Sequence, residues 1–317
     1  MNLFYKKYNR IKNYLKKVNL IHQEISTRNG EREIELYSYK NQKVNLGQIQ
    51  SHLNSQKITI KELSEVEFQV FSQFGDDGII QWLINYLDIP KKTFVEFGVE
   101  KYIEANTRFL LFNNNWNGLV IDGDGNNINY VKRDVVSYFF NLQSIASFIT
   151  KDNINELIKS RDFDQELGLL SIDIDGNDYW IWQSLENINP VIVISEYNAA
   201  FGLNPWTIPY KEDFVWDKVN NMYYWGTSLT SLCDLADQKG YSFIGCNSQG
   251  NNAYFIRNDK IKGLKKISPK DGFVNAKFSL NRKDNGEQFS DFEKRNSMVG
   301  KEIYNTQTNK IEIINAI

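Results

Sequence analysis

Short apolar runs alternate with amphipathic segments from Phe68 onward. The apolar runs predict strands at residues 93–99, 117–122, 135–141, 169–173, 191–195, 241–245 and 253–257. Apolar residues at helical spacing predict helices at residues 76–87, 105–112, 150–158, 178–185 and 228–239. This alternation predicts a doubly wound, Rossmann-like α/β fold with about seven mostly parallel strands. The last two strands lie close in sequence, so we expect them to form an antiparallel edge.

The segment before this domain has a different pattern. Residues 1–20 combine an apolar stripe with six Lys and Arg residues on the other faces, which predicts a basic amphipathic helix. We expect it to pack on its own domain or on a second copy of the chain, in preference to a membrane surface. Residues 33–40 predict a short strand and residues 41–56 a loop.

We therefore divide the chain into three parts. Residues 1–65 form an N-terminal helical appendage, residues 66–260 form the Rossmann-like domain, and residues 261–317 form a C-terminal extension packed on that domain.

Composition narrows the class of protein. The formal net charge of −2 gives no indication of nucleic-acid binding. Two cysteines are too few for a disulfide framework, and no apolar run reaches the roughly 18–20 residues of a membrane span. No secretory signal is visible, so we expect a soluble, cytoplasmic protein. Both histidines, His22 and His52, precede the Rossmann-like domain, which disfavours histidine chemistry there.

Carboxylates follow four of the predicted strands. They lie in Glu96-Phe-Gly98, Asp122-Gly-Asp124, Asp173-Ile-Asp-Gly-Asn-Asp178 and Ser195-Glu-Tyr-Asn198. Ligands of doubly wound sheets bind outside the carboxyl ends of the strands, so these residues are the candidate site. An acid about 20 residues past the first turn, here Asp122, is placed to hold two ribose hydroxyls.

The turn after the first strand disfavours a dinucleotide such as NAD or FAD. Gly98 is followed by Val-Glu-Lys-Tyr-Ile-Glu-Ala, without the further glycines that a pyrophosphate needs for close approach. A ligand with a nucleoside but no phosphates fits this turn better, and S-adenosylmethionine is such a ligand.

The same residues resemble the FkbM-like branch of the S-adenosylmethionine-dependent methyltransferases. The resemblance covers about residues 68–260. It is carried by Ser72-Gln-Phe-Gly-Asp-Asp-Gly78, Phe94-Val-Glu-Phe-Gly98, Gly118-Leu-Val-Ile-Asp122, Leu169-Leu-Ser-Ile-Asp-Ile-Asp-Gly-Asn-Asp-Tyr-Trp180, Val193-Ile-Ser-Glu-Tyr-Asn198 and Asn252-Ala-Tyr-Phe-Ile-Arg257. The glycine-rich first loop that is usual in this superfamily is degenerate here.

The resemblance implies a class I methyltransferase sheet with strand order 3-2-1-4-5-7-6. It implies a cofactor site formed by Gln73, Glu96, Gly98, Asn106, Thr107, Asp122 and Asp173. Within it, Glu96 and Gly98 would line the methionine portion, Asp122 would bind the ribose, and Asn106 and Thr107 would help to close the first loop.

Methyl transfer to a hydroxyl requires alignment and a way to handle the proton. Asp173, Asp175 and Glu196 come from neighbouring strand ends and predict an oxygen-ligand site for Mg²⁺. Two residues apart on a regular strand, Asp173 and Asp175 would share one face, and Gly176 would start the turn. The candidate catalytic residues are Asp175, Asp178 and Glu196. Without a metal, Asp175 or Asp178 would serve as the general base.

Aromatic residues interspersed with Asn and Asp after the fourth and fifth strands favour a carbohydrate or another small polar acceptor. Tyr197, Asn198 and Trp225 are the candidate substrate residues. Two other functions remain open. The two Asp-x-Asp patterns fit a metal-dependent nucleotide-sugar glycosyltransferase, and a non-catalytic cofactor-binding assembly protein would use the basic helix for docking.

Overall fold

The structure is a computed structural model that describes residues 42–163, 166–219, 222–278 and 285–315. The basic helix expected at residues 1–20 and the strand expected at residues 33–40 lie outside these residues. The chain divides into two units, residues 1–48 and residues 49–317. In the first unit the described residues, 42–48, are helical. The second unit contains the domain described below.

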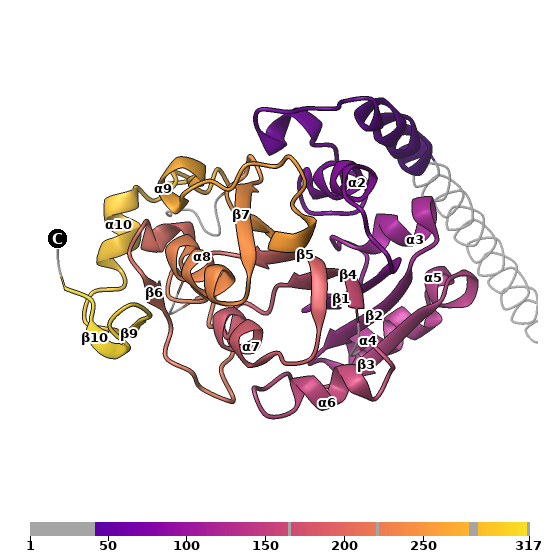
Figure 1. Cartoon of the computed structure of the whole chain (residues 1–317). Coiled ribbons are helices and arrows are strands. Elements are labelled where there is room, and N and C mark those ends of the chain that lie inside the picture. Colours follow the sequence, from indigo (N-terminus) through magenta and orange to yellow (C-terminus); the bar gives the residue numbers. More distant parts are fainter. Residues whose placement is uncertain (1–41, 164–165, 220–221, 279–284, 316–317) are drawn as a thin grey trace, which may run out of the picture. The chain divides into compact units, whose positions relative to one another are not determined.

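A seven-stranded sheet forms the centre of the second unit (Figure 1). Its strands are β1 (Thr93–Phe97), β2 (Asn117–Asp122), β3 (Leu142–Ala146), β4 (Glu166–Ile172), β5 (Asn189–Glu196), β7 (Tyr241–Cys246) and β8 (Asn252–Arg257). The order is β3-β2-β1-β4-β5-β8-β7, with β1–β5 parallel and β8 antiparallel to both of its neighbours. Numbered within this sheet, the order is the predicted 3-2-1-4-5-7-6, so the fold prediction is confirmed.

Helices cover both faces of the sheet. They are α2 (Asp76–Tyr86), α3 (Arg108–Asn114), α4 (Gly125–Arg133), α5 (Val135–Phe139), α6 (Ile154–Lys159), α7 (Asp178–Ser184) and α8 (Leu229–Gln238), with the short 3-10 turn η1 (Leu63–Val66). One hydrophobic core joins the sheet to η1 and α2–α5, and a second joins its other face to α6–α8. Burial on both faces explains why the central strands are continuous apolar runs.

The C-terminal residues form a second, three-stranded antiparallel sheet. Its strands are β6 (Trp206–Thr207), β9 (Glu302–Asn305) and β10 (Lys310–Ile313), in the order β10-β9-β6. The remaining elements are η2 (Ala199–Phe201), η3 (Asn258–Lys260), α9 (Pro269–Gly272) and α10 (Asp291–Asn296). Through β6, the end of the chain therefore pairs with the segment that follows β5.

Two sequence predictions are wrong. Residues 42–55 are helical, whereas a loop was expected over 41–56. In the second unit this helix packs through polar Ser51 and Asn54, which donate hydrogen bonds to Gln81 and to the Val66 carbonyl, while Ile49 and Leu53 are exposed. The apolar residues at helical spacing, Leu46, Ile49 and Leu53, are few and exposed, and Gly47 between them weakens the helical signal of the sequence.

The strand expected at residues 135–141 is instead the helix α5, and β3 begins only at Leu142. Asp134 caps α5 by accepting a hydrogen bond from the Val136 amide. The β-branched and aromatic composition of this segment suits a strand, but the capping residue before it favours a helix.

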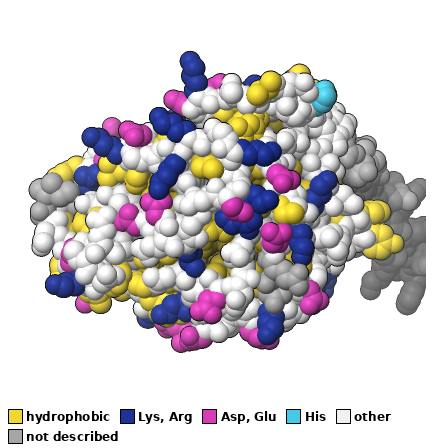
Figure 2. Space-filling view, in the orientation of Figure 1, with side chains coloured by type: hydrophobic (Ala, Val, Ile, Leu, Met, Phe, Trp, Pro, Cys, Tyr) yellow, Lys and Arg dark blue, Asp and Glu magenta, His cyan; other side chains and the backbone are white. Residues whose placement is uncertain are grey.

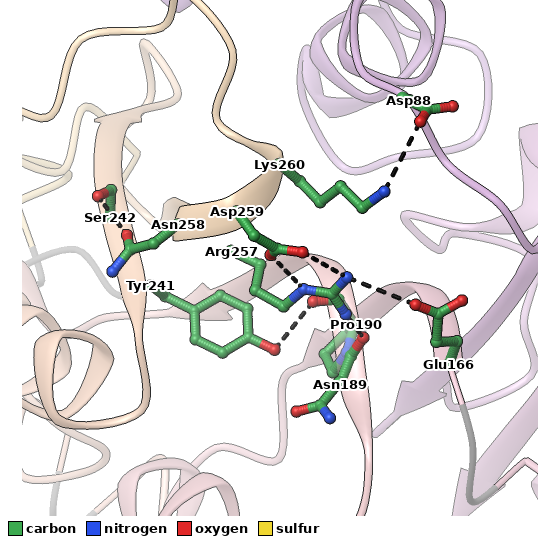
Figure 3. Close-up of polar contacts among 10 residues, drawn as sticks. All are labelled: Asp88, Glu166, Asn189, Pro190, Tyr241, Ser242, Arg257, Asn258, Asp259 and Lys260. Atoms are coloured by element: carbon green, nitrogen blue, oxygen red, sulfur yellow. Dashed lines mark hydrogen bonds and ion pairs between the residues drawn. The ribbon is translucent and has the colours of Figure 1, made fainter.

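Polar contacts join the strands at the amino end of the parallel sheet (Figure 3). The Arg257 guanidinium, at the end of β8, donates to the Asn189 carbonyl and forms ion pairs with Asp259 and Glu166. The Tyr241 hydroxyl donates to the Pro190 carbonyl over 2.8 Å. These contacts occupy the end of the sheet opposite the candidate site.

Lys and Arg side chains are interspersed with Asp and Glu over the face shown in Figure 2. Cys233 and Cys246 are buried free thiols. Among the described residues, no helix has both the length and the apolar character that crossing a membrane requires.

Candidate functional site

The carboxyl ends of β1, β4 and β5 border two adjoining cavities. The larger has a volume of about 540 Å³, and the smaller, beside β2, of about 190 Å³. Both are lined by Gly98, Glu100, Asp173 and Asp175. They lie where the strand order reverses, between β1 and β4, which is the ligand site of doubly wound sheets.

Gly98 brings the ends of β1 and β4 into direct contact. It has a φ of +72°, a conformation that residues with a Cβ rarely adopt. A Cβ on Gly98 would stand 1.6 Å from the carbonyl oxygen of Asp173. The glycine predicted from the first-turn motif is therefore needed for the close approach of two strand ends, and it also lines both cavities.

Glu96 is buried beneath the larger cavity, where it orders the loop before α3. Its carboxylate accepts hydrogen bonds from the backbone amides of Asn106 and Thr107 and from the Thr107 hydroxyl. Glu96 and Asn106 line the larger cavity, as a cofactor site requires. Thr107 is fully buried and lines neither cavity, so its contribution is to hold the loop in place and not to contact a ligand.

The burial of Glu96 predicts a pH-dependent stability. Desolvation raises its pKa from 4.5 to about 7, and burial raises the pKa of Asp77 and of Asp178 to about 6. The folded state thus binds these protons more tightly than the unfolded state, and the stabilisation is lost as the pH rises through the folded pKa. We expect the free energy of unfolding to fall between about pH 4.5 and pH 7, by about 3 kcal/mol for Glu96 alone. Urea unfolding at pH 5 and pH 8 measures this, and equal stability at both would contradict it.

Asp122 ends β2 at the smaller cavity. Its Oδ2 accepts the Glu100 amide over 2.7 Å, and its Oδ1 accepts the Asp124 amide over 2.8 Å. Ile121, Phe148, Ile149 and Phe214 supply apolar walls beside it. A carboxylate at the edge of an apolar recess is the arrangement that a nucleoside requires, with hydroxyls at one end and a flat base at the other.

Asp173, Asp175 and Glu196 converge on the larger cavity. Each offers one carboxylate oxygen, and these three oxygens lie within 4.8 Å of one another. Burial raises the pKa of Asp173 and of Glu196. The charge of Asp175 raises the pKa of Asp173 further, and the charge of Asp173 raises the pKa of Glu196 further. The Oε2 atom of Glu196 has no hydrogen-bond partner among the described residues. Three close acids fit either a shared proton or a divalent cation.

The turn that carries these acids differs from the predicted one. β4 ends at Ile172, and Asp175 itself has a φ of +55°, so Gly176 does not start the turn. The Phe214 ring packs against Gly176 and leaves no room for a Cβ at this position. Asp178 is buried outside both cavities, where its carboxylate accepts the amides of Ile174 and Gly176. Asp178 therefore holds this turn together, and the prediction that it is a catalytic base is corrected.

Two of the three predicted substrate residues lie elsewhere. Tyr197 and Asn198 line a separate, smaller cavity. The Tyr197 hydroxyl donates to the Val274 carbonyl, and the Asn198 amide bonds the backbone of Tyr223, Trp225 and Ala200. Both side chains thus hold the chain after β5 in place. Strand alternation explains the position of Tyr197, because it comes directly after Glu196 and points to the opposite face of the sheet.

Trp225, the third predicted substrate residue, does line the larger cavity. Its ring packs against Trp216 at 5.3 Å between centroids, and its buried Nε1 has no partner among the described residues. Lys218 also lines this side, 4.8 Å from the Trp216 ring and 3.9 Å from an Asp175 oxygen. Gln73, predicted from the motif before β1, lines the same cavity.

Sequence reasoning missed several lining residues. Phe148 and Ile149 follow β3, whose position was predicted too early, so they were not recognised as a strand end. Phe214 and Trp216 come from an irregular segment without periodicity. Asn251 and Asn252 stand at the start of the antiparallel β8, whose amino end lies at the carboxyl edge of the parallel strands. Because this strand was predicted to be antiparallel, its first residues could have been recognised as lying at the candidate site.

Comparisons with known proteins found similar solved structures of low sequence identity. No family model and no curated protein matches the sequence. Among solved structures, the chain is similar to a putative caffeoyl-CoA O-methyltransferase from Staphylococcus aureus, with 15% identity over 72% of this chain and 99% of that one and a TM-score of 0.38.

Two further solved structures are similar to the chain. For the N-terminal domain of EvdMO1 with SAH bound, identity is 8% over 52% of this chain and 72% of that one, with a TM-score of 0.35. For an S-adenosylmethionine-dependent methyltransferase from Clostridium acetobutylicum, identity is 10% over 52% and 83%, with a TM-score of 0.34. What the two cavities of this protein can bind is therefore inferred from their own lining residues.

Proposed function

We propose that the protein is an S-adenosylmethionine-dependent O-methyltransferase that acts on a hydroxyl of a small polar or carbohydrate-type acceptor. One observation carries the proposal. At the point where the strand order reverses, an apolar recess that ends in Asp122 adjoins a larger polar cavity that contains three carboxylates. The recess suits a nucleoside without phosphates, and the larger cavity leaves room for a second reactant.

The chain's own residues would place the cofactor across both cavities. Asp122 would bind the ribose, and Phe148 and Ile149 would enclose the adenine. Gly98, Glu96 and Gln73 line the larger cavity, where the methionine portion would lie. When bound, S-adenosylmethionine supplies an electrophilic methyl group on a sulfonium. The carboxylates beside it would offset that positive charge.

The larger cavity favours a neutral acceptor. It is lined by the acids Glu96, Glu100, Glu104, Asp173, Asp175 and Glu196, against two lysines, Lys101 and Lys218. A doubly charged phosphate group on the acceptor would be repelled by this excess of acids. The indole faces of Trp216 and Trp225 suit the apolar face of a sugar ring, and the surrounding amides and carboxylates suit its hydroxyls.

Asp173, Asp175 and Glu196 fit a divalent cation by the chemistry of their donors, since hard cations prefer carboxylate oxygens. A cation held there would lower the pKa of an acceptor hydroxyl. Asp175 is the most accessible of the three and lines both cavities, so we assign it the proton that leaves the acceptor oxygen. The acceptor oxygen then bonds to the methyl carbon as the bond from carbon to sulfur breaks.

A metal-dependent glycosyltransferase has less support. Of the two Asp-x-Asp patterns, Asp122-Gly-Asp124 has only its first acid at a cavity. Asp124 lines neither cavity and caps α4 by accepting the Asn126 amide. A nucleoside diphosphate would also meet the excess of acids described above. A non-catalytic role would leave the three converging carboxylates without a purpose.

Asp122→Ala tests the placement of the cofactor. We expect it to weaken the binding of S-adenosylhomocysteine by about 1–3 kcal/mol, because it removes a charge-assisted hydrogen bond to the ribose. Isothermal titration calorimetry measures the affinity, and circular dichroism confirms that the variant is folded. Unchanged affinity in a folded variant would remove Asp122 from the cofactor site.

A further inference from the structure

Two buried oxygens without partners lie on the wall of the larger cavity that β5 and β8 form. Glu196 and Asn252 are directly paired across these antiparallel strands, so their side chains stand on the same face of the sheet. Both residues line the cavity, and they are 9% and 3% exposed. Neither Oε2 of Glu196 nor Oδ1 of Asn252 has a hydrogen-bond partner among the described residues. A buried acceptor without a donor is costly and requires an explanation.

The orientation of the Asn252 amide is fixed from below by Asp76. The Asp76 carboxylate is fully buried at the start of α2 and accepts hydrogen bonds from the side chains of Asn247, Asn252 and Tyr254. A carboxylate that receives several donors can only accept, so the Asn252 Nδ2 must face Asp76. The Asn252 Oδ1 is then the atom left for another partner.

The neighbouring amides are fixed in the same way. Asn247 donates to Asp76 and to Asn251 through Nδ2, and its Oδ1 accepts the backbone amides of Gly250, Asn251 and Asn252. Exchange of its oxygen and nitrogen would break all of these bonds. The turn between β7 and β8 is thus held by Asp76 and Asn247 without any ligand.

This arrangement gives a role to the motif Ser72-Gln-Phe-Gly-Asp-Asp-Gly78. The Asp77 carboxylate accepts the backbone amides of Val70, Phe71 and Ser72 and so folds the loop before α2. Gly78 lets this loop pack closely, since a Cβ there would stand 2.1 Å from the Val66 carbonyl oxygen. The motif places Gln73 on the cavity wall and Asp76 beneath Asn252.

We propose that Asn252 is a binding residue for the acceptor, accepting a hydrogen bond from an acceptor hydroxyl beside Glu196, and that Asp76 is the residue that positions it. The inference rests on the methyl-transfer function proposed above and names the surface that recognises the acceptor. The Asn252 Oδ1, an uncharged acceptor beside the carboxylates, suits a hydroxyl of a neutral polyol. It disfavours an acceptor that presents an anionic oxygen there.

The first experiment measures release of S-adenosylhomocysteine by the full chain in the presence of Mg²⁺. The probes are methyl glycosides of glucose, mannose and galactose, myo-inositol and glucose 6-phosphate. We expect turnover with at least one neutral polyol and none with glucose 6-phosphate. If S-adenosylhomocysteine binds but no neutral polyol reacts, this inference is wrong and the cofactor site stands. If S-adenosylhomocysteine does not bind, the proposed function itself fails.

The second experiment compares variants on the reactive polyol. Asn252→Ala and Asp76→Asn should each raise its KM by about tenfold and leave the affinity for S-adenosylhomocysteine within twofold. Asn155→Ala is the matched control, because Asn155 also joins two segments through its amide but lies outside both cavities. It should lower thermal stability without raising KM. Asn252→Ser replaces Asn252→Ala should the latter fail to fold.

A deoxy analogue of the reactive polyol completes the test. The analogue that lacks the recognised hydroxyl should raise KM for the wild type but add no further increase for Asn252→Ala, because the same hydrogen bond is then lost only once. An unchanged KM in Asn252→Ala, or independent effects of variant and analogue, would overturn the proposal.

Discussion

Gly98→Ala is expected to lower the free energy of unfolding by about 3–5 kcal/mol and to abolish cofactor binding. The residue has a φ of +72°, where a Cβ adds strain. The new methyl group would also stand 1.6 Å from the Asp173 carbonyl oxygen, which is backbone and cannot rotate away. The ends of β1 and β4 would have to separate, and both cavities share those ends.

Gly125→Ala is the control for this substitution. Gly125 lies at the start of α4, and a Cβ there would meet no atom within 4 Å. The stability of Gly125→Ala should equal or exceed that of the wild type by up to about 1 kcal/mol, since alanine favours a helix. Urea unfolding and titration with S-adenosylhomocysteine measure both variants. A stable, cofactor-binding Gly98→Ala protein would show that the contact between these strand ends is dispensable.

Removal of divalent cations is expected to have the largest effect on activity. If Asp173, Asp175 and Glu196 hold a cation, exhaustive chelation should slow methyl transfer at least about 100-fold, and added Mg²⁺ or Mn²⁺ should restore it. Asp173→Asn should cause a similar loss that added metal does not restore, because one of the three oxygen ligands is gone.

Asp124→Asn is the matched control for the metal prediction. It changes an acid in the other Asp-x-Asp pattern, where the side chain caps α4 and asparagine caps equally well. Activity should stay within about twofold of the wild type. Full turnover in chelator would exclude the cation. The three carboxylates would then serve only to accept the proton of the acceptor hydroxyl. A strong loss in Asp124→Asn would instead favour the diphosphate-binding alternative.

The sheet was predictable because its strands other than β3 are marked by apolar runs in the sequence. Strands buried on both faces are continuous apolar runs, and their alternation with helices predicts a mostly parallel sheet. The strand order was implied by the family resemblance. Errors arose where a local contact decides the structure. Asp134 caps a helix in a segment that has strand composition. A second helix packs inward through polar Ser51 and Asn54, while its apolar Ile49 and Leu53 are exposed.

The candidate site was predictable up to the strand ends and no further. Parallel topology brings Gly98, Asp122, Asp173 and Glu196 to one edge, whatever their side chains do. Whether an acid faces the cavity depends on its contacts. The Asp178 carboxylate accepts backbone amides of the turn before it and does not face a cavity. Asn252 was missed because its role depends on Asp76, which is 176 positions away in the sequence.

The central claim is that this strand edge binds S-adenosylmethionine, and calorimetric titration with two ligands tests it most directly. We predict that S-adenosylhomocysteine binds the full chain at one site with a Kd of about 1–100 µM, and that uridine diphosphate does not bind with or without Mn²⁺. Binding of uridine diphosphate with Mn²⁺, together with no heat from S-adenosylhomocysteine, would contradict the account and assign the cavities to a nucleotide-sugar donor.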